Sequence, residues 1–140
     1  MQLLIADSDS TLTCLFRSFF TRQGFDVETT NDGLQCLSST LQHQPDILVM
    51  SYKLPWGGGD GVLARLREEF NHLPTGVILI LEAESEDEVA HEFLWPVVGC
   101  LQKPFRLSEL SKMINSSIDV TSSRNETHDE SESLYLEPKI

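Results

Sequence analysis

Charged and hydroxyl side chains stand where the apolar stretches of this sequence stop. They are Asp7, Ser8 and Asp9 after residues 2–6, Ser51 after residues 47–50, Glu82 after residues 77–81, and Lys103 after residues 97–102. Side chains at the carboxyl ends of neighbouring parallel strands point into one crevice, so we expect these groups to share a site. A serine at the end of a buried strand can act as a nucleophile only if an adjacent base activates it.

The sequence gives Ser51 none of the surroundings of a hydrolase nucleophile. The pattern G-x-S-x-G is absent, because Val49 and Lys53 occupy the glycine positions. The four histidines fall in expected helices, loops or the tail: His43, His72, His91 and His128. The glycine-rich residues 57–61 lack the lysine of a phosphate-binding loop. A small-ligand-binding module that uses the crevice stays an alternative, although the aspartates of DSDSTL disfavour a flavin phosphate there.

The elements that must position these groups alternate between strand and helix. Apolar runs predict strands at residues 2–6, 25–30, 47–50, 77–81 and 97–102. Apolar residues at helical spacing predict helices at residues 10–22, 34–41, 60–70, 86–95 and 107–118. Strict alternation predicts a parallel sheet with helices on both faces, that is, a doubly wound α/β domain over residues 1–118. Residues 119–140 are acidic and poor in apolar side chains, and we expect a disordered tail.

Composition narrows the class of protein. A chain of 140 residues can bury one core without a metal or disulfide staple. Its net charge of −12 disfavours nucleic acid and anionic membranes as partners and favours a basic protein surface. Three widely spaced cysteines, the lack of a leader sequence and the lack of a long apolar run favour a reduced, cytoplasmic protein.

Four stretches in this order, LLIADSDS, DILVMSYKLPWGGGDG, VILILEA and GCLQKPF, resemble the receiver domain of bacterial two-component response regulators. The resemblance implies a flavodoxin-like fold with strand order 2-1-3-4-5. In that family an acidic pair holds Mg²⁺, an aspartate accepts a phosphoryl group, a threonine or serine contacts it, and a lysine completes the site. The matching positions here are Asp7 and Ser8 for the acids, Ser51 for the phosphoacceptor, Glu82 for the hydroxyl residue, Lys103 for the lysine, and Cys100 for the aromatic switch.

These departures from the family pattern all oppose phosphorylation. With one carboxylate left, the site should bind Mg²⁺ weakly, although Asp7 and Asp9 could keep a weak residual site. A serine is a poorer nucleophile than a carboxylate, and Glu82 adds negative charge where phosphoryl oxygens would lie. Glu82 could instead pair with Lys103 in place of the phosphate, or point to water at the start of an acidic helix. We therefore expect a degenerate receiver that needs no cofactor and is not an enzyme.

The function expected from the resemblance is that of a stand-alone, phosphorylation-independent protein-interaction module in bacterial two-component signalling. The expected partner is a protein, such as a histidine kinase or another signalling protein. Trp56, Trp95 and Arg106 are the candidate contact residues. In the family, the surface of the fourth helix, fifth strand and fifth helix serves dimerisation, which here implies residues 86–118. An alternative is a receiver that is still phosphorylated at an unusual residue, Ser51 or Asp60.

Overall fold

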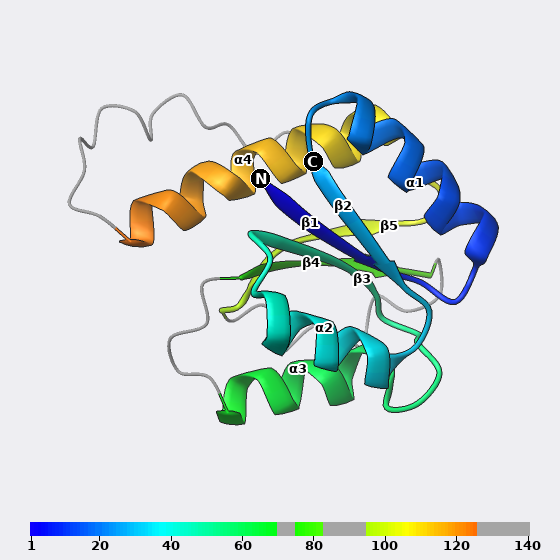
Figure 1. The fold of residues 1–140 in the computed structure, drawn as a ribbon, viewed down its shortest axis with the longest axis vertical. Helices are drawn as coiled ribbons and strands as arrows, with labels where there is room; N and C mark the ends of the chain where they lie inside the picture. Colours follow the sequence, from blue (N-terminus) through cyan, green and yellow to red (C-terminus); the bar gives the residue numbers. More distant parts are fainter. Residues whose placement is uncertain (70–74, 83–94, 126–140) are drawn as a thin grey trace.

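The computed structural model describes residues 1–69, 75–82 and 95–125, and it contains a five-stranded parallel sheet in the order β2-β1-β3-β4-β5 (Figure 1). The strands are β1 (Gln2–Ala6), β2 (Asp26–Thr30), β3 (Ile47–Ser51), β4 (Gly76–Leu81) and β5 (Val97–Gln102). The helices are α1 (Ser10–Arg22), α2 (Gly33–His43), α3 (Gly58–Glu69) and α4 (Leu107–Asn125). The doubly wound fold and its strand order are as predicted.

The sheet lies between two helical layers, with α2 and α3 on one face and α1 and α4 on the other (Figure 1). Successive residues of a strand point to opposite faces of the sheet, so one strand contributes side chains to two cores. Leu4 belongs to the core that contains Leu63 and Leu66 of α3, whereas Leu3 belongs to the core that contains Phe16 and Phe20 of α1. All five residues of β3 are buried. A central strand covered on both faces explains the continuous apolar run in the sequence.

Aspartates fix where two of the helices begin. Asp9 caps α1, and its Oδ1 accepts the backbone N–H groups of Thr11 at 3.0 Å and Leu12 at 3.2 Å. Asp32 caps α2 in the same way, and its Oδ1 accepts the N–H of Gln35 at 2.8 Å. These carboxylates satisfy N–H groups that have no partner inside the helix. Both caps stand at the carboxyl edge of the sheet, beside the expected crevice.

The last helix is longer than the sequence pattern predicts. We expected it to end at Ile118, but α4 continues to Asn125, so the predicted end of this helix is wrong. No glycine or proline follows Ile118 before Pro138, and an established helix extends readily where nothing stops it. No helix in the described part of the chain combines the length and apolar character that a membrane span needs. The helix expected at residues 86–95 falls largely outside the described residues, as does the rest of the tail.

Candidate functional site

Asp7 lies at the carboxyl edge of the sheet, directly after β1, and is only 4% exposed. Its backbone N–H donates to the Thr30 carbonyl at 3.1 Å, which continues the β1–β2 pairing past the end of both strands. Its Oδ1 accepts the backbone N–H of Asp9 at 2.9 Å. Asn31 Nδ2 donates to the Asp7 carbonyl at 3.1 Å. The backbone and one carboxylate oxygen are thus held in place where little water reaches.

Lys103 lies between two carboxylates at the same edge. Its Nζ is 3.1 Å from Glu82 Oε2 and 3.6 Å from Asp7 Oδ2. Partial burial lowers the pKa of Lys103, but the hydrogen bond with Glu82 and the charges of Asp7 and Glu82 outweigh it, and the pKa is raised above its ordinary value. The ammonium group is therefore charged at neutral pH and already has two partners within the chain.

Strand pairing brings Glu82 and Lys103 together. Leu81 pairs with Gln102 in the β4–β5 register, and the Lys103 N–H donates to the Leu81 carbonyl at 2.8 Å. Glu82 and Lys103 are the next residues along the two strands, so their side chains leave the sheet side by side. Of the two orientations considered for Glu82, the structure has the one directed at Lys103. The sequence contained this signal, because both residues directly follow apolar strand runs.

The two serines of the candidate site differ in exposure. Ser51 is the last residue of β3 and is 4% exposed, whereas Ser8 is exposed. Asp60, considered as an alternative phosphorylation site, is exposed in the first turn of α3. Ser51 is held by the register of β3 against β4, where it pairs with Ile80. The buried hydroxyl and the exposed carboxylate therefore offer very different access to a phosphodonor.

The side chains at this edge do not fit a Mg²⁺ site. Mg²⁺ prefers an octahedron of oxygen ligands and is usually held by one or two carboxylates. Asp7 Oδ1 accepts the Asp9 N–H and Asp7 Oδ2 faces Lys103 Nζ, while Asp9 Oδ1 caps α1. Among residues 1–69, 75–82 and 95–125, no group of three His, Cys, Asp or Glu side chains is placed to hold a metal ion. Both oxygens of the Asp7 carboxylate therefore already face a partner within the chain.

The loop from β3 to α3 is held against the start of α2, which sequence reasoning missed. The Gly33 N–H donates to the Pro55 carbonyl at 2.7 Å. A Cβ at Gly33 would overlap the carbonyl of Trp56, so only glycine fits beneath this loop. Trp56 has a positive φ of 61°, an uncommon conformation for a residue with a side chain, and is 72% exposed. The loop thus presents the indole to solvent from a fixed backbone.

The other candidate contact residues do not gather around Trp56. Trp95 is half-buried, precedes β5 at the opposite edge of the sheet, and accepts a hydrogen bond from Arg67 Nε at 3.3 Å through its carbonyl. Arg106 is exposed after β5, and its N–H donates to Glu109 Oε1 at 3.1 Å. Cys100 lies within β5, where burial raises the pKa of its thiol to about 11. These residues form separate parts of the surface.

A family model described as the response regulator receiver domain matches residues 3–115. Among curated proteins, the response regulator MprA of Mycobacterium leprae is 32% identical over 119 residues, which is 83% of this chain and 50% of that protein. The sensor histidine kinase TmoS of Ectopseudomonas mendocina is 28% identical over 142 residues, which is 96% of this chain and 14% of TmoS. The chain therefore spans about half the length of MprA and a small part of TmoS.

The signal receiver domain of a LuxO repressor protein from Vibrio parahaemolyticus has a similar structure. The two superpose with a TM-score of 0.81 at 19% sequence identity, over 91% of this chain and 98% of that one. At this level of identity, the likeness concerns the arrangement of strands and helices. It agrees with the strand order of the sheet described above.

Proposed function

The chain belongs to the family of response regulator receiver domains of two-component signalling, and we propose that it acts there as a protein-interaction module that does not depend on phosphorylation. It catalyses no phosphoryl transfer of its own and requires no cofactor. The partner reads one fixed arrangement of the crevice and of the surface around it.

The observation that carries this proposal is the position of Lys103 between Glu82 and Asp7. In a receiver that accepts a phosphoryl group, the family lysine must be available to neutralise that group. Here the ammonium is 3.1 Å from Glu82 and 3.6 Å from Asp7 without any modification. A phosphoryl group would have to displace the Glu82 carboxylate or lie beside it, and like charges in a partly buried cleft repel. Glu82 thus takes the place of the signal as the partner of Lys103.

The serines at the same edge support the proposal. Ser51 has a neutral hydroxyl where the family has a carboxylate, and a hydroxyl needs a base to become a good nucleophile. Ser8 removes one of the two acids that hold the metal, and the remaining acid, Asp7, already faces Lys103 and the Asp9 N–H. Each change lowers reactivity towards a phosphodonor, and none of them disturbs the packing of the sheet, because Ser51 remains buried in register.

The proposed partner is a signalling protein with a basic surface, such as a histidine kinase. A chain with a net charge of −12 associates faster with a positively charged surface. Trp56 provides a large exposed apolar contact, of the kind that often contributes strongly to binding energy at interfaces. Self-association through α4, β5 and the preceding segment belongs to the same proposal and can be measured by light scattering.

Intact mass spectrometry tests the proposal directly. The wild type, Ser51→Asp, and the triple variant Ser8→Asp/Ser51→Asp/Glu82→Thr are each incubated with Mg²⁺ and acetyl phosphate. We expect no added phosphoryl group on the wild type and a clear gain on the triple variant. We expect Ser51→Asp alone to react weakly, because Lys103 still forms its ion pair with Glu82.

Other outcomes would change the proposal. A phosphorylated wild type would contradict phosphorylation independence, and mapping would then distinguish Ser51 from Asp60. An unreactive triple variant that is folded by circular dichroism would show that other features of the scaffold block the reaction. The role assigned to Glu82 would then be wrong.

A further inference from the structure

The loop between β3 and α3 (residues 52–57) holds Trp56 in a strained conformation with its side chain in water. Trp56 has a positive φ of 61°, which glycine and asparagine adopt more readily than a residue with a bulky side chain, and it is 72% exposed. Packing within the chain therefore does little to offset the backbone strain. A residue that combines strain with an exposed apolar side chain is a candidate for contact with another molecule.

A second exposed apolar side chain, that of Leu34 in α2, lies at the same edge of the sheet. The loop runs close to the start of α2, because the Gly33 N–H donates to the Pro55 carbonyl at 2.7 Å and the Trp56 carbonyl lies against Gly33 (Figure 1). Leu34 is the next residue and is 64% exposed. Two large exposed apolar residues thus come from segments that the backbone holds together.

A free carboxylate lies beside this loop. Gly58 has a positive φ of 69°, and a Cβ there would overlap Asp60 Oδ1, so the Asp60 carboxylate is turned back against the end of the loop. Asp60 is exposed and forms no hydrogen bond or ion pair with any residue that the structure describes. The Cα atoms of Trp56 and Gly58, two residues apart, are separated by at most about 7 Å. A cation paired with Asp60 is therefore within reach of the indole.

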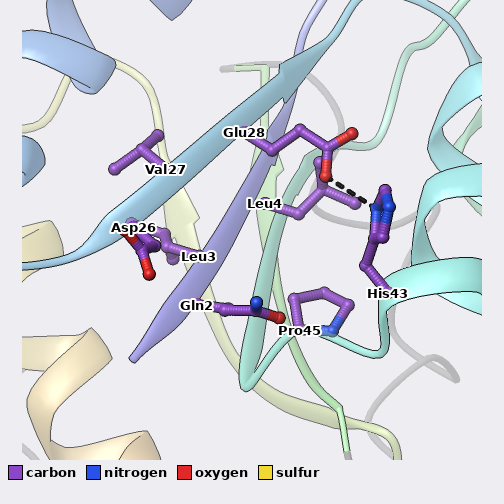
Figure 2. Close-up of a pocket in the computed structure, with 8 residues that line it drawn as sticks. All are labelled: Gln2, Leu3, Leu4, Asp26, Val27, Glu28, His43 and Pro45. Carbon is purple, nitrogen blue, oxygen red and sulfur yellow. Dashed lines mark hydrogen bonds and ion pairs between the residues drawn. The ribbon is translucent and has the colours of Figure 1, made fainter.

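The pocket beside Glu28, at the opposite edge of the sheet, lacks a free carboxylate at that residue. Figure 2 shows Glu28 and His43 directed at each other. Glu28 Oε1 is 3.0 Å from His43 Nδ1, and Oε2 accepts a hydrogen bond from Ser39 Oγ at 3.0 Å. Leu4, which lines the same pocket, is only 1% exposed. The Glu28 carboxylate is thus satisfied within the chain, whereas that of Asp60 is not.

We propose that Trp56, Leu34 and Asp60 form a docking site for an arginine side chain in a segment that also carries an apolar residue. The arginine belongs to the protein partner of the proposed function, on which this docking site rests. Its planar guanidinium stacks on the indole and pairs with the Asp60 carboxylate, and the apolar residue contacts Leu34. The net charge of −12 favours a cationic occupant. A second copy of this chain would bring the same net charge and its own Asp60 to the contact, which disfavours self-association here.

Titration of ¹⁵N-labelled protein with a short peptide tests the docking site. The probe is acetyl-Gly-Leu-Arg-Leu-Gly-amide, and its control has citrulline, a neutral isostere, in place of arginine. We expect saturable shifts of the Trp56 indole N–H signal and of the Leu34 and Asp60 backbone signals, with a Kd on the order of 1 mM. The citrulline peptide should bind about tenfold more weakly, because it lacks the charge for both contacts. Equal binding of the two peptides would overturn the proposal.

Matched variants separate the docking site from the acidic surface in general. Asp60→Asn should weaken binding of the arginine peptide about threefold to fivefold, whereas Glu68→Gln removes the same charge near the other end of α3 and should leave the Kd unchanged. Trp56→Asn should weaken binding about fivefold without lowering the unfolding temperature, because asparagine accepts a positive φ. Lys53→Gln removes an exposed cation from the loop and should strengthen binding about twofold. Equal losses in Asp60→Asn and Glu68→Gln, or wild-type binding by Trp56→Asn, would overturn the proposal.

Two measurements distinguish failure of the docking site from failure of the proposed function. Intact mass after incubation with acetyl phosphate reports on phosphorylation alone, so a phosphorylated wild type would contradict the proposed function whether or not the peptide binds. An unmodified wild type that does not bind the arginine peptide would overturn the docking site and leave phosphorylation independence standing. Light scattering that shows a dimer which Trp56→Asn abolishes would assign this surface to a second copy, and the arginine partner would be wrong.

Discussion

Replacing Lys103 by methionine removes the positive charge from the candidate site while keeping most of the side-chain volume. Methionine cannot pair with either carboxylate, so Asp7, which is 4% exposed, loses its counter-charge. Glu82 loses its partner too, but its side chain is 37% exposed and water can solvate it. The two carboxylates therefore respond unequally to the same substitution.

The size of the effect follows from these positions. The substitution removes the attraction between the ammonium and Asp7, which at 3.6 Å and an effective dielectric constant of 20 is about 5 kcal/mol. Methionine also avoids the cost of partly burying the ammonium, which offsets part of this loss, and water around Glu82 screens the second pairing. We expect Lys103→Met to lower the free energy of unfolding by about 2–3 kcal/mol. Glu82→Gln should cost less than about 1 kcal/mol.

Urea unfolding at pH 7, followed by far-ultraviolet circular dichroism, measures both values. A loss of 2 kcal/mol would lower the midpoint by about 1 M. Lys112→Met is the matched control, because Lys112 is exposed on α4 and its substitution should change stability by less than about 0.5 kcal/mol. The reasoning fails if Lys103→Met costs no more than Lys112→Met, or if Glu82→Gln costs more than Lys103→Met.

Three further predictions concern stability and thiol chemistry. The pKa of Lys103 is raised in the folded state, so its contribution to the free energy of unfolding is complete below about pH 10.4 and is lost as pH rises through the folded-state value. Urea unfolding across pH 9–12 should therefore show the free energies of unfolding of wild type and Lys103→Met converging as pH rises. Gly33→Ala should cost about 1–3 kcal/mol by overlap with the β3–α3 loop, whereas Gly61→Ala should be neutral or stabilising in thermal unfolding. Exposed Cys14 should react with a disulfide reagent in the native protein, and Cys36, whose pKa burial raises to about 12, only after unfolding.

The fold could be predicted from the sequence because the local pattern of apolar residues in each strand agrees with the burial of that strand in the sheet. The continuous apolar runs of β3 and β4 are those of strands buried on both faces, and both strands are fully buried. The positions of Glu82 and Lys103 side by side also follow from strand order, since each residue directly follows a strand and the two strands are neighbours.

The other features depend on contacts between segments that are far apart in the sequence, and no periodic pattern of residue types marks such contacts. The fit of the Trp56 carbonyl against Gly33 could not be read from a turn-like Asn31-Asp32-Gly33, because any turn there would favour glycine. Asp9 looked like a substitute metal ligand, but its position before an apolar helix also makes it a cap, and the structure uses it as one. The pocket beside Glu28 exists because α2 ends at His43, and pairing of Glu28 with His43 requires β2 to lie beneath that end.

The Lys103 arrangement has a consequence for how information could pass through this protein. A receiver with a reversible modification reports a stimulus through the fraction of molecules that carry it, at constant abundance. Under the proposed function, a chain whose Lys103 ammonium is paired with its own Glu82 has no such fraction to vary. The fraction of partner molecules that are bound is then set, by mass action, by the concentration of this protein. Synthesis and degradation would set the strength and duration of the output, on the timescale of growth rather than of phosphoryl turnover.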